Sequence, residues 1–144
     1  MRVTNALVGT GLISFALLTA APLAAETMNF AATLDNAQEV PPTKATATGN
    51  VAMTFDGETK LLTWKGSYSG LTGAATAAHF HGPAPAGKNA PVVVPIAEFG
   101  SSFEGKATLT APQSSELLAG ELYVNVHTAA NPNGEIRGQV IKVK

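Results

Sequence analysis

Residues 46–55 read TATGNVAMTF and alternate apolar with polar side chains along their whole length. The positions on one face are Ala47, Gly49, Val51, Met53 and Phe55. An alternation with a period of two is typical of a β-strand that buries one face. The turn sequence DGET follows at once, and residues 60–68 (KLLTWKGSY) resume the alternation with Leu62 and Trp64 on one face. The stretch therefore predicts two successive strands, each with one buried face.

Further strands are predicted along the rest of the chain, with Gly and Pro in almost every gap between them. They are Met28–Leu34, Ala74–His81, Pro91–Phe99, Phe103–Thr110, Glu121–Thr128 and Glu135–Val143. Ser114–Gly120 predicts a single helical turn, with Ser as its cap and Gly as its stop. About seven or eight short strands without a long amphipathic helix predict an all-β fold, an antiparallel two-layer β-sandwich. Its core should hold Phe55, Trp64, Phe80 and Leu122.

The first 25 residues form a separate segment. A basic start precedes the apolar stretch Ala6–Ala20, and small residues surround Ala25. This order is typical of a secretory signal peptide, and the apolar stretch is shorter than the ~20 residues of a membrane-spanning helix. We therefore predict a signal peptide at 1–25 with cleavage after Ala25. One mature domain, 26–144, should follow without a membrane span, in the periplasm or secreted.

The composition limits the chemistry that the chain can perform. It contains no cysteine, so any metal ion would need imidazole, carboxylate or carbonyl ligands, and no disulfide can form. The formal net charge is −1 and the sequence shows no basic patch, so nothing indicates a nucleic-acid partner. The sequence also shows no convincing Ser-His-Asp set, acid pair or phosphate-binding glycine loop. We therefore predict that the protein is not an enzyme.

All three histidines lie where a predicted strand meets a loop rich in Pro, Gly or Asn. His79 and His81 stand in AAHFHGPAPAG, and His127 stands in YVNVHTAANPNG. Side chains at i and i+2 share a strand face, so His79 and His81 lie about 7 Å apart along the strand and can reach one ion. Phe80 should point to the opposite face. His127 can supply a third imidazole if its strand lies beside the first, and imidazole suits copper and zinc.

Glu135 and Arg137 follow a strong Asn-Gly turn and should share one face of the last strand. The plainer interpretation is a surface ion pair that contributes little to stability. We favour a structural role in which the Arg137 guanidinium spans neighbouring carbonyls or carboxylates and ties the last strand to a loop.

The histidine segments carry a family resemblance. AHFHGPAPAGKNAPVVVPI, followed by LLAGELYVNVHTAANPNGEIRGQV, resembles the CHRD domain, a module repeated in chordin and also found alone in exported bacterial proteins. The upstream stretches LDNAQEVPPTKATATGNVAMTFD and LTWKGSYSGLTG resemble the opening segments of that family. The resemblance covers essentially the whole predicted mature chain, and it implies an immunoglobulin-like or superoxide-dismutase-like Greek-key sandwich. It also implies that His79, His81 and His127 are motif histidines, with Tyr123 and Asn125 as further motif matches.

Two functions remain open at this point. In the first, His79, His81 and His127 bind copper, or alternatively zinc, in an exported non-enzymatic protein, with an affinity that falls as the pH drops through about 6.5. In the second, the histidines hold strand ends to loops through hydrogen bonds, and the domain binds another protein or a matrix polymer. In chordin the module belongs to an extracellular protein that binds growth factors, but a family does not fix a function. A redox copper activity is a third reading, for which no substrate-shaping residues are evident.

Overall fold

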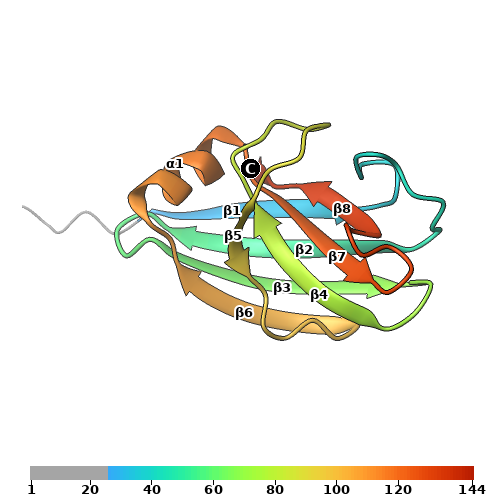
Figure 1. Ribbon diagram of the computed structural model, residues 1–144. Coiled ribbons are helices and arrows are strands. Elements are labelled where there is room, and N and C mark those ends of the chain that lie inside the picture. The colour runs from blue at the N-terminus through green and yellow to red at the C-terminus, as the bar shows by residue number, and fades with distance from the viewer. Residues whose placement is uncertain (1–25) are drawn as a thin grey trace, which may run out of the picture.

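A computed structural model describes residues 26–144, which form two antiparallel β-sheets stacked face to face (Figure 1). The larger sheet has the order β6-β3-β2-β1-β9 and the smaller sheet the order β5-β4-β7-β8. The larger sheet contains β1 (Thr27–Leu34), β2 (Thr48–Asp56), β3 (Leu61–Ser69), β6 (Ser102–Thr108) and β9 (Ile141–Val143). The smaller sheet contains β4 (Ala75–His81), β5 (Val92–Pro95), β7 (Tyr123–Thr128) and β8 (Ile136–Gln139). The all-β sandwich is thereby confirmed, whereas the predicted signal peptide lies outside the described residues.

The apolar core lies between the two sheets and follows from the alternation in the sequence. In β2 the side chains of Val51, Met53 and Phe55 are buried, while the positions between them are exposed. Trp64 from the larger sheet meets Phe80 from the smaller sheet edge to face, with ring centroids 5.1 Å apart. The four predicted core residues are all buried: Phe55, Trp64, Phe80 and Leu122.

Three predicted elements differ from the structure. The strand predicted at Pro91–Phe99 is shorter, because β5 spans only Val92–Pro95. The last strand is divided at Val140, so β8 belongs to the smaller sheet and β9 to the larger one. The helix is longer than the predicted turn: α1 (Ala111–Ala119) begins after Thr110, which forms a capping box with Gln113, and ends at Gly120 in the left-handed conformation (φ 74°). This helix is not long and apolar enough to cross a membrane, and it is the only helix within residues 26–144.

Three loops cover the outer face of the smaller sheet, the face that points away from the core. They run through residues 35–47, 82–91 and 129–135 and cover the outward side chains of β7, while Val124 and Val126 face the core, so all six residues of β7 are buried. In Figure 1 the smaller sheet crosses in front of the larger one, so this covered face is turned toward the viewer. The domain therefore has two buried layers: the apolar core, and a polar layer on the outside of β4, β7 and β8.

Candidate metal centre

The three histidines meet in this polar layer. His79 and His81 point outward from β4, while Phe80 between them is fully buried in the apolar core, as predicted. The neighbouring strand β7 brings His127 opposite Ala77, whose small side chain leaves room for the ring. No two of the facing ring nitrogens are more than 4.8 Å apart. His81 and His127 are each 8% exposed, whereas His79 is only partly buried and gives solvent access to the cluster.

Backbone carbonyls determine which nitrogen is free on two of the rings. Nδ1 of His81 is 3.0 Å from the Ala90 carbonyl oxygen, and Nδ1 of His127 is 2.9 Å from the Pro132 carbonyl oxygen. A carbonyl oxygen only accepts hydrogen bonds, so each Nδ1 carries a proton. In a neutral ring the other nitrogen, Nε2, then carries a lone pair and no proton. The covering loops therefore fix the tautomer that a metal ligand requires.

The two free Nε2 atoms point toward a third acceptor. Oδ1 of Asn125 is 3.0 Å from Nε2 of His81 and 2.9 Å from Nε2 of His127. Nδ1 of His79 is 3.1 Å from the same His127 nitrogen. With neutral rings, lone pairs from His81, Asn125 and His127 converge on one another, and Nδ1 of His79 is the one ring atom of the cluster that could place a hydrogen among them.

The surroundings disfavour a positive charge on two of the rings, His79 and His81. Burial lowers the pKa of His79, and the adjacent His127 and His81 lower it further. Burial also lowers the pKa of His81, and this effect outweighs the hydrogen bonds to Ala90 and Asn125 that favour its charged form. Protonation of His79 or His81 is therefore disfavoured, whereas a bound cation would satisfy all the lone pairs at once.

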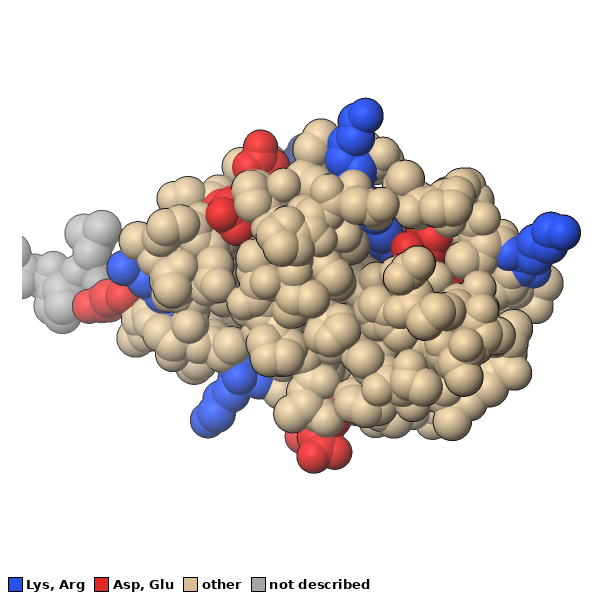
Figure 2. All heavy atoms as spheres, viewed as in Figure 1, with Lys and Arg blue, Asp and Glu red and all other residues tan. Residues whose placement is uncertain are grey.

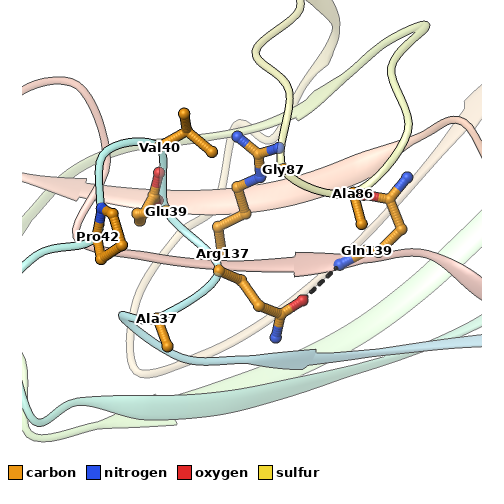
Figure 3. A pocket seen from close by; sticks show the side chains of 9 residues that line it. Ala37, Glu39, Val40, Pro42, Ala86, Gly87, Arg137 and Gln139 are labelled. Atoms are coloured by element: carbon orange, nitrogen blue, oxygen red, sulfur yellow. Dashed lines mark hydrogen bonds between the residues drawn. The ribbon is translucent and has the colours of Figure 1, made fainter.

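Arg137 supports the centre from β8, where it is 1% exposed. Its guanidinium donates to Oδ1 of Asn89 at 2.9 Å and to the carbonyl oxygen of Lys88. Both acceptors belong to the loop that carries Ala90, so the predicted role of Arg137 in tying the last strand to a loop is confirmed. Figure 3 shows the side chain reaching from β8 toward Gly87 in this loop.

Glu135 has a separate structural role and does not pair with Arg137. Its carboxylate is fully buried and accepts hydrogen bonds from Thr72 N (2.7 Å), Thr72 Oγ1 (2.6 Å), Thr128 Oγ1 (2.5 Å) and Asn131 Nδ2 (2.9 Å). The ion-pair interpretation was wrong, because the single ion pair within residues 26–144 joins the exposed side chains of Lys65 and Glu104.

Glu39 also belongs to the polar layer, although no pattern in the sequence indicated this. It is 5% exposed and its Oε1 atom has no hydrogen-bond partner among the described residues. Burial raises the pKa of Glu39 to about 7, against the opposing effects of Arg137, the Val40 backbone and the Asn125 amide. Beside it lies a cavity of about 290 Å³ lined by Glu39, Arg137 and Gln139 among others, and no histidine lines this cavity (Figure 3).

The fold and the cluster together define an all-β domain with a histidine centre on the outer face of its smaller sheet. The CHRD domain family matches residues 30–140, and the chain therefore belongs to this family, which is not a known family of enzymes. Comparison with curated proteins and with solved structures gives no significant match. Figure 2 shows few charged side chains on the face that carries the covering loops, with both signs present, and nothing there indicates nucleic-acid binding.

Proposed function

We propose that this protein is an exported, non-enzymatic CHRD-domain protein that binds one metal ion through His79, His81 and His127. The observation that carries the proposal is the convergence of unprotonated ring nitrogens: the loops hold the protons of His81 and His127 on Nδ1, and both Nε2 atoms face other acceptors. Removal of this mutual repulsion by a cation would stabilise the centre. Export rests on the signal-peptide pattern of residues 1–25.

Copper is the preferred ion and zinc the alternative. Imidazole suits both metals, and copper stands highest in the general order of affinities for divalent ions. Metal availability outside the cytoplasm can reverse this preference in the cell. The nitrogen-to-metal distances should be about 2.0–2.1 Å for zinc.

A second function is favoured by the same ring contacts. The bonds from His81 to Ala90 and from His127 to Pro132 fasten strand ends to loops, which is the role expected of structural histidines. In that case the domain would serve as an extracytoplasmic module that binds a protein or matrix partner. The two functions differ in what they require of Nε2, which is a ligand atom only in the first.

Calorimetric titration of the metal-free protein with Cu²⁺ and Zn²⁺ separates the two functions. The wild type should bind one equivalent, and His79→Ala, His81→Ala and His127→Ala should each weaken binding by at least about tenfold. Glu104→Gln, which alters an exposed side chain far from the cluster in the fold, is the matched control and should bind as the wild type does. Equally weak binding by the wild type and all three histidine variants would favour the interaction module. Metal analysis of protein taken from its exported fraction would identify the ion.

A further inference from the structure

Asn125 occupies the middle of the histidine cluster and is 2% exposed. It lies on β7 directly opposite His79 on β4 and opposite Arg137 on β8. Its Oδ1 atom is within 3.0 Å of the free nitrogens of both His81 and His127. A purely structural asparagine at this position would be expected to direct its N–H groups toward such acceptors, and this one directs its oxygen toward them.

The orientation of the amide follows from what lies on its other side. Asn125 Nδ2 and Glu39 Oε1 both lie where a Cβ on Gly134 would stand, so no side chain can separate the amide from the carboxyl group. An amide N–H is attracted to carboxyl oxygens, whereas a flipped amide would place Oδ1 against them. Glu39 therefore holds Asn125 with its nitrogen toward the carboxyl group and its oxygen toward the histidines.

The spacings between the four candidate ligand atoms fit a common ion. Two donors bound at right angles, as in the tetragonal geometry of Cu²⁺, with bonds of about 2.0–2.1 Å lie about 2.9 Å apart. The three successive spacings are 3.0 Å (His81 to Asn125), 2.9 Å (Asn125 to His127) and 3.1 Å (His127 to His79). Opposite donors would lie about 4.1 Å apart, so nitrogens at the 4.8 Å limit would close by about 0.7 Å on binding.

We infer that Oδ1 of Asn125 is the fourth protein ligand of this centre, so that three nitrogens and one oxygen select a divalent ion, Cu²⁺ or Zn²⁺, over a cuprous ion. This inference rests on the proposed metal-binding function. An amide oxygen is a harder ligand than the thiolate and thioether groups that select cuprous ions, and a four-cornered set of nitrogen and oxygen donors is typical of Cu²⁺. Glu39 acts as a positioning residue, because it orients the ligand and does not touch the ion.

Electron paramagnetic resonance of the Cu²⁺-loaded protein in water enriched in oxygen-17 tests the fourth ligand. If Asn125 fills the position, the wild-type spectrum shows no broadening from equatorial water. Asn125→Leu keeps the size of the side chain and removes the oxygen. Its spectrum should broaden as water takes the vacated position, and its Cu²⁺ affinity should fall by at least about tenfold. Asn29→Leu, an exposed Asn on β1, is the matched control and should behave as the wild type does.

Each outcome has a distinct meaning. Wild-type protein that binds Cu²⁺ but shows broadening from equatorial water overturns the fourth ligand and leaves the three-histidine function intact. Wild-type protein that binds neither Cu²⁺ nor Zn²⁺ overturns the proposed function, and the inference with it. Broadening of the wild-type spectrum would overturn the inference even if Asn125→Leu fails to fold.

Discussion

The guanidinium carbon of Arg137 lies 3.6 Å from the centre of the Tyr123 ring, close enough for a cation–π contact. The Tyr123 ring is also parallel to the imidazole of His81, with 4.8 Å between their centroids. The hydroxyl of Tyr123 contacts Ala90, the residue whose carbonyl holds the His81 proton. Arg137 thus supports both the aromatic surface beside His81 and the loop that orients that ring.

Arg137→Lys should therefore affect the centre without changing its charge. Lysine cannot reproduce the planar fork that contacts Asn89 and Lys88 or the flat contact with Tyr123. We expect the free energy of unfolding to fall by about 1–3 kcal/mol and Cu²⁺ affinity to fall by about tenfold. Urea unfolding and calorimetry measure the two effects. Lys65→Arg, at an exposed ion pair, is the control. An Arg137→Lys protein with the stability and the Cu²⁺ affinity of the wild type would contradict the supporting role of Arg137.

Glu39→Gln should change the pH dependence of stability in the metal-free protein. The pKa of Glu39 is raised from 4.5 to about 7, so the folded chain binds this proton more tightly than the unfolded chain. Its stabilising contribution is therefore complete below pH 4.5 and is lost as the pH rises through about 7. The always-neutral Gln variant should become more stable than the wild type by about 1–2 kcal/mol near pH 9, after allowance for solvent access. Urea unfolding between about pH 4.5 and pH 9 measures the difference in stability between the variant and the wild type. A difference that does not change with pH would contradict the predicted effect of Glu39 ionisation.

The buried carboxylate of Glu135 should show the opposite behaviour. Burial raises its pKa, but hydrogen bonds from Thr128, Thr72 and Asn131 together outweigh burial and leave the pKa below 4.5. The stability that it contributes is therefore present above pH 4.5 and is lost as the pH falls through the folded-state pKa.

Glu135→Gln places an amide N–H group against donors that need an acceptor. We expect the free energy of unfolding to fall by about 2–3 kcal/mol at pH 7. The difference from the wild type should become smaller in acid, and urea unfolding at several pH values measures it. Glu98→Gln, an exposed carboxylate, is the control and should stay within about 0.5 kcal/mol of the wild type. Equal losses for the two variants would show that the hydrogen bonds to Glu135 add nothing.

Gly105→Ala should disturb the only tryptophan of the chain. A Cβ at Gly105 would lie 2.6 Å from Cζ2 of Trp64, whose ring is held on another side by Phe80. Because the ring cannot move away freely, we expect a loss of about 1–3 kcal/mol and a changed Trp64 emission spectrum. Gly73→Ala is the control, because no atom lies within 4 Å of a Cβ at Gly73. This variant should leave the free energy of unfolding and the Trp64 emission spectrum unchanged. Tryptophan fluorescence during urea unfolding reports on both variants.

The sequence predicted the sandwich because burial of one strand face imposes a period of two, as β2 and β3 show. It could not predict the division at Val140, because an apolar residue is expected on either side of a crossing between sheets. The start of α1 was missed although it was readable, since Thr110 and Gln113 have the spacing of a capping box.

The candidate site was predictable only in part from the sequence. The shared face of His79 and His81 follows from their spacing, but the position of His127 depends on the order of the strands, which the spacing does not reveal. Glu39 reaches the centre through a loop fold that no local pattern encodes. The pH threshold of about 6.5 for metal binding stays a prediction, and the lowered pKa values of His79 and His81 favour a more acidic threshold.

Because β7 is buried on both faces, its alignment with β4 is determined by the core and by the polar layer together. A slip of one residue would turn Asn125 and His127 into the apolar core and Val124 and Val126 into the polar layer. Either exchange is costly, so the strand has only one acceptable alignment with β4. A misaligned histidine cluster would for that reason also disrupt the core, so chains that complete the fold hold His79, His81 and His127 in register.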